Sequence, residues 1–189
     1  MTAQLARAAI LAVGSEMLTP YRLDTNSLFL TEQLNALGID VVFKQVVGDD
    51  RDELGFLFSA SLVRVPLVIV TGGLGPTDDD VTREVVAKIL NRRLSEELRR
   101  RFAARGLGIP MPEINRRQAM VPEGAVVIEN AHGSAPGLWL EDGDRVVLLL
   151  PGPPRELRPM VVDSIVPKLR SRAGGVGIVR RELRIAGSV

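Results

Sequence analysis

The chain has 189 residues, of which 46% are hydrophobic, with a formal net charge of +1, no cysteine and one histidine. This length suits one domain with a substantial core, and the balanced charge gives no electrostatic case for a nucleic-acid or membrane partner. The missing cysteines exclude disulfides, zinc–thiolate sites and thiol nucleophiles, and they fit a reducing cytoplasm. The N-terminal residues lack a signal-peptide core and no apolar run reaches the length of a membrane span, so a cytoplasmic location is expected.

The first strand and helix are predicted from a continuous apolar run followed by a capped amphipathic segment. Residues 8–13 predict a buried strand that stops at Gly14-Ser15-Glu16. The acid in this turn either forms one wall of a site or belongs to an ordinary strand–helix turn, and the residues alone do not choose. A helix is expected from residue 24 to 37, capped by Asp24 or Thr25.

A second strand and helix follow in the same pattern. Residues 39–47 predict a strand that leads into Gly48-Asp49-Asp50, and residues 51–63 predict a helix. Asp50 is placed to cap that helix. Asp49, just ahead of it, is freer to take part in chemistry, although a Gly-Asp pair is also ordinary turn material.

The stretch around the third strand is the most informative in the chain. Residues 67–70 are apolar and β-branched, which predicts a strand buried on both faces. The turn that follows contains three glycines, which permit a ligand to approach the backbone: Gly72, Gly73 and Gly75. Thr77 and Asp80 have the spacing of a capping box, so a helix is expected to begin there. Such turns open at the carboxyl edge of an α/β sheet, where these sheets bind ligands.

Three consecutive acids, Asp78 to Asp80, close this turn. They would repel a phosphate unless a divalent cation lay between. The alternative is a capped helix whose acids are solvated. The pattern is neither a P-loop nor a dinucleotide-binding fingerprint.

The second half of the chain predicts shorter elements. The basic residues near Arg100 are offset by Glu96 and Glu97 and have no interleaved aromatics, which argues against nucleic acid. A stiff elbow, Pro151-Gly152-Pro153-Pro154, ends the last strand of a hairpin. The remaining expected elements are a helix over 81–90, a surface helix over 95–105, a short helix over 112–120, a turn over 121–124, strands over 125–128, 138–140 and 145–150, a helix over 155–169 and a tail strand over 179–185.

Several of these segments together resemble one known family. Gly14-Ser15-Glu16, Gly48-Asp49-Asp50, the Thr71–Thr82 stretch and Leu150–Pro154 look like the N-terminal domain of the CinA (competence/damage-inducible) family. That domain belongs to the molybdopterin-binding superfamily, with MogA, MoaB and part of MoeA. Further matches in the right order are Asn26, Asn115-Arg116, Gln118-Ala119 and Ser134–Gly137, so the resemblance covers about residues 8 to 170.

The resemblance implies a fold and an activity. The fold would be α/β, a three-layer α/β/α sandwich with a mostly parallel sheet, over residues 1–172. Residues 173–189 would be a tail strand that opens a truncated KH-type domain. The activity would be metal-dependent hydrolysis of ADP-ribose to AMP and ribose 5-phosphate. The alternative is a module that binds molybdopterin or a nucleotide without hydrolysing it. A homo-oligomer, with a dimer favoured, is expected by analogy with relatives.

The resemblance also implies which residues form the site. Asp80 and Asp49 would be the catalytic acids, and together with Glu16 or Asp79 they would hold Mg²⁺, Mn²⁺ or Co²⁺. The substrate-binding residues would be Thr71, Gly72, Gly73, Gly75, Asn26, Ser134, Pro151, Gly152 and Pro153. The chain departs from the family pattern at Ser15, where Thr is usual, and at Thr19-Pro20-Tyr21-Arg22, which replaces a segment that contains glycine.

Overall fold

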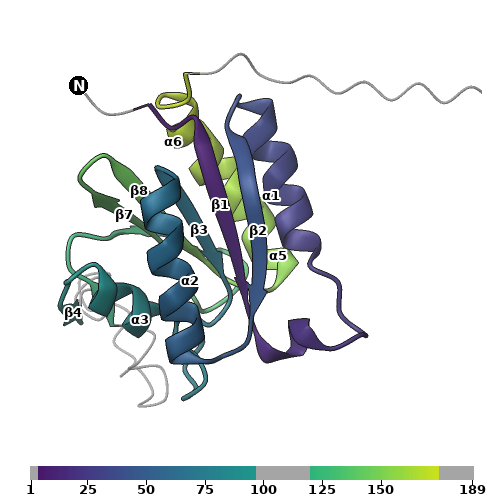
Figure 1. Ribbon diagram of the computed structural model, residues 1–189, viewed down its shortest axis with the longest axis vertical. Coiled ribbons are helices and arrows are strands. Elements are labelled where there is room, and N and C mark those ends of the chain that lie inside the picture. Colours follow the sequence, from purple (N-terminus) through teal and green to yellow (C-terminus); the bar gives the residue numbers. More distant parts are fainter. Residues whose placement is uncertain (1–3, 97–119, 175–189) are drawn as a thin grey trace, which may run out of the picture.

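A six-stranded sheet forms the centre of the molecule in the computed structural model, which describes residues 4–96 and 120–174 (Figure 1). The strand order is β2-β1-β3-β8-β7-β6. Strands β2, β1, β3 and β8 are parallel, and β7 is antiparallel to both of its neighbours. The bounds are β1 (Arg7–Val13), β2 (Asp40–Val47), β3 (Leu67–Thr71), β6 (Val126–Ile128), β7 (Gly137–Asp142) and β8 (Arg145–Leu150). The sheet is therefore mostly parallel, as the sequence predicted.

Helices cover both faces of this sheet (Figure 1). The helices on one face are α1 (Thr25–Ala36), α5 (Pro154–Met160), the π-helical turn η3 (Val161–Ile165) and α6 (Val166–Arg170), and those on the other are α2 (Arg51–Arg64) and α3 (Thr82–Ile89). A short 3-10 helix, η1 (Ser15–Leu18), follows β1, and β4 (Leu94–Ser95) pairs with β5 (Val121–Pro122). The three-layer α/β/α prediction is confirmed.

The sheet has a hydrophobic core on each of its two faces, and this explains why the central strands have no polar side. In β1, Ala9 and Leu11 pack in the cluster that holds α2 and α3, whereas Ala8 and Ile10 pack in the cluster that holds α1, α5 and α6. Successive side chains of a strand point to opposite faces. Because both faces are covered, every position must be apolar, and the strand appears in the sequence as a continuous hydrophobic run.

Two predicted helix caps are confirmed. The carboxylate of Asp24 accepts a hydrogen bond from Ser27 N at 2.9 Å and begins α1. The carboxylate of Asp50 accepts from the backbone N–H groups of Asp52 and Glu53, both at 2.9 Å, and begins α2. Each cap satisfies amides that have no partner inside the helix, so these two loops enter their helices at fixed positions.

Two predicted boundaries are wrong, and one helix of about the expected span is not a regular α-helix. Helix α3 begins at Thr82, not at Thr77, because the Asp80 carboxylate turns back into the preceding loop. The single helix expected over 155–169 contains Pro159 and changes to a π-helical turn at Val161. Proline lacks the N–H that a helix interior uses, which disturbs the regular ladder. Residues 121–122, expected in a turn, form strand β5.

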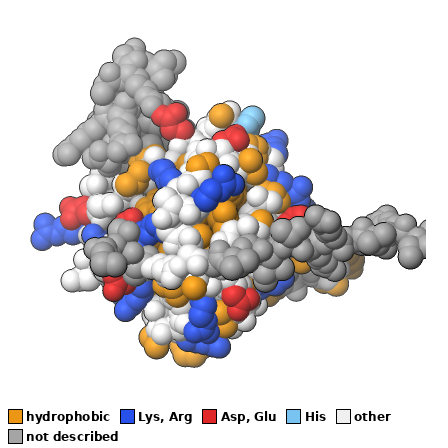
Figure 2. All heavy atoms as spheres, turned by 90° about the horizontal axis from the view of Figure 1, so that it is seen from above, with side chains coloured by type: hydrophobic (Ala, Val, Ile, Leu, Met, Phe, Trp, Pro, Cys, Tyr) orange, Lys and Arg blue, Asp and Glu red, His pale blue; other side chains and the backbone are white. Residues whose placement is uncertain are grey.

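Other predictions fall outside the described residues. These are the tail strand over 179–185, the short helix over 112–120 and most of the helix over 95–105. Within residues 4–96 and 120–174, no helix is long and apolar enough to cross a membrane. Basic and acidic side chains both occur on the face of the molecule that Figure 2 shows, among apolar and other polar ones, so neither sign of charge dominates it.

Candidate functional site

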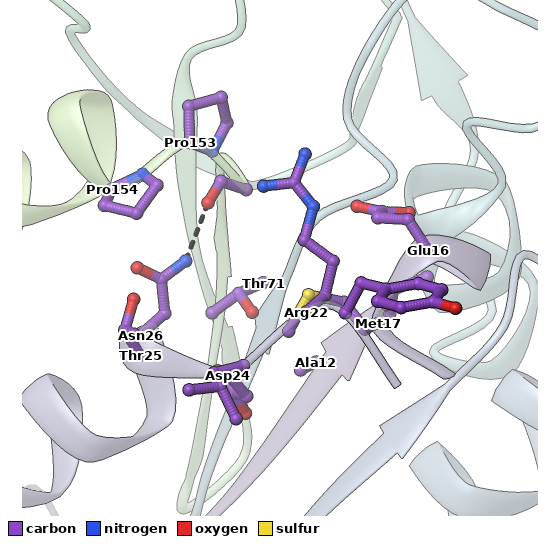
Figure 3. A pocket seen from close by; sticks show the side chains of 14 residues that line it. Ala12, Glu16, Met17, Arg22, Asp24, Thr25, Asn26, Thr71, Pro153 and Pro154 are labelled. Carbon is purple, nitrogen blue, oxygen red and sulfur yellow. Dashed lines mark hydrogen bonds between the residues drawn. The ribbon is translucent and has the colours of Figure 1, made fainter. Parts of the chain in front are cut away.

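A cavity of about 610 Å³ lies at the carboxyl ends of three neighbouring parallel strands (Figure 3). Strand β1 contributes Ala12 and Val13, β3 contributes Thr71, and the segment after β8 contributes Gly152 and Pro153. The connection after β1 leads to α1 on one face of the sheet, and the connection after β3 leads to α3 on the other. Open α/β sheets bind ligands where the connections diverge in this way, and the volume suits a small organic ligand.

The segment between β1 and α1 forms the outer wall of the cavity. Its lining residues are Glu16, Met17, Tyr21, Arg22, Leu23 and Asp24, and all of them except Met17 and Asp24 are exposed. Tyr21 is 91% exposed and Leu23 is 84% exposed. The wall therefore combines two carboxylates, one guanidinium and apolar surface at the mouth of the cavity.

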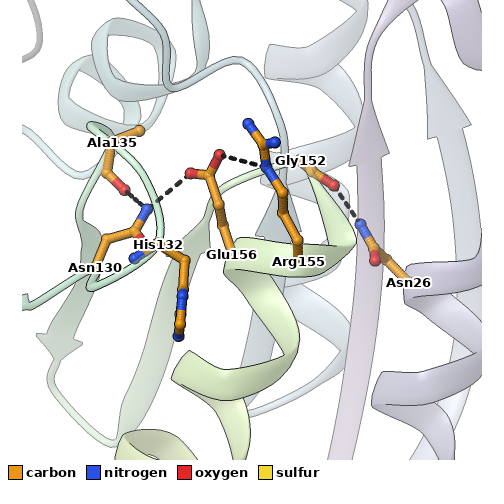
Figure 4. Close-up of polar contacts among 7 residues, drawn as sticks. All are labelled: Asn26, Asn130, His132, Ala135, Gly152, Arg155 and Glu156. Carbon is orange, nitrogen blue, oxygen red and sulfur yellow. Dashed lines mark hydrogen bonds and ion pairs between the residues drawn. The ribbon is translucent and has the colours of Figure 1, made fainter.

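Asn26 joins the start of α1 to the elbow after β8. Its Nδ2 donates to the carbonyl oxygen of Gly152 at 2.7 Å (Figures 3 and 4). The side chain is 8% exposed, and its Oδ1 is buried without a hydrogen-bond partner among the described residues. A buried acceptor without a donor costs free energy, so the buried position of Asn26 lowers the stability of the fold to some extent.

The glycine turn after β3 brings two strand ends into direct backbone contact. Gly72 has φ of +90°, and a methyl group on its Cα would lie 2.1 Å from the carbonyl oxygen of Val13. Its N–H donates to the carbonyl oxygen of Leu150 at 2.9 Å. Only glycine permits both the left-handed backbone and this approach. The carboxyl ends of β1, β3 and β8 are therefore held together by direct backbone contacts next to the cavity.

Asp80 lies inside the glycine turn and binds it together. Its Oδ1 accepts from Gly75 N at 2.6 Å, and its Oδ2 accepts from Thr77 N at 2.9 Å and from Thr77 Oγ1 at 2.6 Å. Hydrogen bonds to an ionised carboxylate are among the stronger ones in proteins. The Thr77–Asp80 contact that the sequence predicted is present, but it closes a loop and does not begin a helix.

Arg83 supports the same turn from below. Its guanidinium donates to the carbonyl oxygens of Leu74 and, at 2.7 Å, of Gly75, and the residue is only 5% exposed. Burial lowers the pKa of Arg83 to about 10, against the attraction of Asp80 and Glu84, which raises it. The turn thus lies between two charged side chains. The Asp80 carboxylate accepts hydrogen bonds from its backbone amides, and the Arg83 guanidinium donates hydrogen bonds to its carbonyl groups.

Asp49 is fixed to the end of β1 by a reciprocal pair of hydrogen bonds. Its Oδ2 accepts from Ser15 N at 2.8 Å, and its own N–H donates to Ser15 Oγ at 3.1 Å. This pair holds the end of β2 beside the residue that precedes Glu16. Ser15 replaces the usual threonine but keeps the hydroxyl that accepts this bond.

The predicted acids are all among the described residues, and the structure does not bring them into one cluster. Within residues 4–96 and 120–174, no group of three or more His, Asp and Glu side chains could hold a metal ion. Glu16 lines the cavity, whereas Asp49, Asp79 and Asp80 are not among its lining residues. Asp79 is exposed.

The loop that contains Ser134 is anchored beside the elbow, as Figure 4 shows. Asn130 Nδ2 donates to the carbonyl oxygen of Ala135 at 2.8 Å and to Glu156 Oε2 at 2.7 Å. Glu156 is 8% exposed, and a methyl group on Gly133 would lie 2.0 Å from Oε2. A buried carboxylate therefore holds this loop against the start of α5.

The cavity contains part of the predicted substrate-binding set. Those that line it are Thr71, Asn26, Gly152 and Pro153, and those that do not are Gly72, Gly73, Gly75, Ser134 and Pro151. Sequence reasoning did not include Tyr21 and Arg22 among the site residues, although both line the cavity. An arginine and a tyrosine in the loop after the first parallel strand are a usable signal, because that loop always opens at the carboxyl edge of the sheet.

Comparison with known proteins agrees with this fold. The family model described as "Probable molybdopterin binding domain" matches residues 9–171. A CinA-like protein of Solibacter usitatus is 50% identical over 186 residues, which cover 95% of this chain and 44% of the relative. A CinA-like protein of Koribacter versatilis is 48% identical over 189 residues, 95% of this chain and 45% of the relative. The chain thus spans less than half the length of these curated relatives.

Solved structures show the same architecture. The crystal structure of CinA from Thermoplasma acidophilum superposes with a TM-score of 0.78 at 33% identity, over 86% of this chain and 98% of that one. MoaB from Thermus thermophilus superposes with a TM-score of 0.56 at 21% identity, over 89% of this chain and 99% of that one, which shows a shared fold alone. The chain belongs to the molybdopterin-binding domain family, and within that family it is CinA-like.

Proposed function

We propose that this domain hydrolyses the diphosphate linkage of a nucleoside diphosphate derivative, with ADP-ribose as the first substrate, to give AMP and ribose 5-phosphate. The observation that carries the proposal is the cavity at the ends of β1, β3 and β8, whose charged lining includes both Glu16 and Arg22. A diphosphate with a bound cation presents a positive and a negative group side by side. The Glu16 carboxylate would complement the cation, and the Arg22 guanidinium would complement the phosphate.

The donor set fits a cation that comes with the substrate. Mg²⁺ is usually held by one or two carboxylates, several waters and the phosphates of the substrate, not by a complete protein cage. Glu16 in the cavity and Asp49, held beside it through Ser15, would supply such carboxylates. Asp80 and Asp79 remain further candidates. When bound, Mg²⁺, Mn²⁺ or Co²⁺ would neutralise phosphate charge and lower the pKa of a bound water.

The chain's own groups would position the substrate. Hydrolysis adds water across the linkage, so that the oxygen of water joins one phosphorus atom and the bridging oxygen leaves with the other phosphate. Thr71 and the Gly152–Pro153 backbone lie on the floor of the cavity, where they would contact the sugar and phosphate. Because the Pro151–Pro154 elbow is already rigid, it loses little conformational entropy when a ligand binds. Asp49 and Asp80 are the proposed catalytic acids.

The test is AMP release from ADP-ribose with magnesium, manganese or cobalt and with a chelator. We expect metal-dependent release from the wild type and a loss of about 100-fold or more in Glu16→Gln, because general acid–base and metal-holding groups typically contribute that much. Glu32→Gln is the matched control, since Glu32 is an exposed residue of α1 that does not line the cavity. A wild type without AMP release, or a Glu16→Gln variant as active as the control, would contradict the proposal.

The second candidate is a binding module that holds molybdopterin or a nucleotide without hydrolysing it. It is favoured by the description of the matching family model, "Probable molybdopterin binding domain". Ligand binding in calorimetry without any metal-dependent product would support this candidate over hydrolysis.

A further inference from the structure

Arg22 lines the cavity together with two carboxylates, Glu16 and Asp24, and forms an ion pair with neither of them. It lines the cavity, and its guanidinium makes no hydrogen bond or ion pair with any residue that the structure describes. Some arginines among the described residues are paired with acids, for example Arg51 with Glu84 and Arg145 with Asp142. An unpaired guanidinium at a cavity wall is a group still free to bind an anion.

The position of Arg22 places this charge opposite two other groups. In Figure 3 its guanidinium lies between the Glu16 carboxylate and the elbow at Pro153. Glu16 and Arg22 do not form an ion pair, although both side chains line the same cavity. Two opposite charges that face one cavity without neutralising each other leave both available to a ligand.

We propose that Arg22 binds the phosphate groups of the ligand and so selects phosphorylated nucleotides over nucleosides. This inference rests on the proposed function in one respect, that the cavity takes a phosphate-bearing ligand; it does not require turnover. A guanidinium offers a planar fork of N–H donors that matches two phosphate oxygens at once, and a lysine ammonium does not. The residue belongs to the exposed segment between β1 and α1, which forms the outer wall of the cavity.

The test compares ADP with adenosine, which share the base and the ribose and differ only in the diphosphate. Binding is measured by calorimetry on the full chain, in the presence of a chelator so that no hydrolysis occurs. The variants are Arg22→Gln and Arg22→Lys. The control is Arg145→Gln, which removes the same charge at the opposite end of β8 from the cavity.

We expect wild type to bind ADP more tightly than adenosine, and Arg22→Gln to weaken ADP binding by about 10-fold to 100-fold with adenosine unchanged. Arg22→Lys should recover only part of the loss. The affinity of the wild type for ADP should fall with added salt more steeply than that of Arg22→Gln. The Arg145→Gln control should bind ADP like the wild type.

Other results would overturn the inference. These are wild-type binding of ADP no tighter than adenosine, no binding of either, an equal loss for both ligands in Arg22→Gln, or an equal loss in Arg145→Gln. A failure of the proposed hydrolysis looks different, because the wild type would then bind ADP through Arg22 but release no AMP from ADP-ribose. Thermal unfolding of Arg22→Gln at the wild-type temperature would show that the exposed substitution leaves the fold intact.

Discussion

Asn26 and Gly152 are 126 positions apart in the chain, yet Nδ2 of the first donates to the carbonyl oxygen of the second at 2.7 Å. This bond joins the first residues of α1 to the elbow after β8, across the cavity wall that both segments share (Figure 3). The geometry of the cavity therefore depends on a contact that forms only when the two halves of the sheet are assembled.

Asn26→Ala removes this contact. We expect the free energy of unfolding to fall by about 1 kcal/mol, the usual net contribution of one intramolecular hydrogen bond, as measured by urea denaturation. Nucleotide binding should weaken as well, since the elbow is no longer held. Asn35→Ala, in the last turn of the same helix, is the control. Equal stability of the two variants would show that the Asn26–Gly152 bond contributes nothing net.

Gly72→Ala tests the backbone contact beneath the cavity. The added methyl group would lie 2.1 Å from the Val13 carbonyl oxygen at a φ of +90°, so both strain and a clash oppose it. We expect a loss of more than about 2 kcal/mol of unfolding free energy. Gly143→Ala is the matched control, because it also has positive φ, at +59°, but nothing within 4 Å of the new atom. That variant should lose only about 1 kcal/mol.

Arg83→Gln tests the support of the glycine turn. The carbonyl groups of Leu74 and Gly75 would lose their buried donor, so we expect a loss of about 2 kcal/mol in urea denaturation. Arg51→Gln breaks an ion pair whose side chains are 50% and 43% exposed, and exposed pairs contribute little. A variant of Arg83 as stable as that of Arg51 would contradict this role.

Arg83 also predicts a pH dependence. Its pKa falls from its ordinary value to about 10 in the folded chain, because burial disfavours the charge. Below pH 10 both folded and unfolded chains are protonated, and the cost of the buried charge is constant. Above pH 10 the unfolded chain binds more protons than the folded chain, so the contribution of Arg83 to stability rises with pH. The difference in unfolding free energy between wild type and Arg83→Gln, measured from pH 7 to 11, should therefore be flat and then increase.

Asp80→Asn separates a structural from a catalytic role for this acid. The amide group replaces one of the two oxygens that accept from Gly75 and Thr77, so we expect a loss of about 1 to 3 kcal/mol in unfolding free energy. Asp79→Asn, at an exposed neighbour, should leave stability unchanged. AMP release by Asp80→Asn is then assayed well below the unfolding temperature of this variant, so that any loss of activity reflects the reaction step and not unfolding. Full activity in the folded variant would remove Asp80 from the catalytic acids.

Sequence reasoning found the strands because a strand covered on both faces must be apolar at every position, as in 8–13 and 67–70. It found the caps at Asp24 and Asp50 because capping is decided within three residues. It misplaced the start of α3 because Thr77 and Asp80 have the same spacing in a capping box and in a closed loop. The position of the Gly75 amide, which is set by the sheet, decides whether the capping box or the closed loop forms.

Sequence reasoning also did not place Arg22 in the lining of the cavity. The direction in which a loop side chain points follows from the path of the backbone. Unlike a helix or a strand, a loop has no periodic sequence pattern that reveals this direction. Similarly, nothing in the letters around Asn26 indicates a partner 126 residues away. Local rules thus located the edge of the sheet where the cavity lies, and long-range packing decided which side chains enter it.

The contact between Gly72 and the Val13 carbonyl oxygen determines where this domain can be redesigned. The junction of β1 and β3 has no room for a side chain, so substitution there cannot reshape the ligand site without damage to the sheet. Residues 18–23 are all exposed and carry the outer wall. Grafting this six-residue segment from another family member onto the present chain should therefore change ligand preference while the scaffold stays intact.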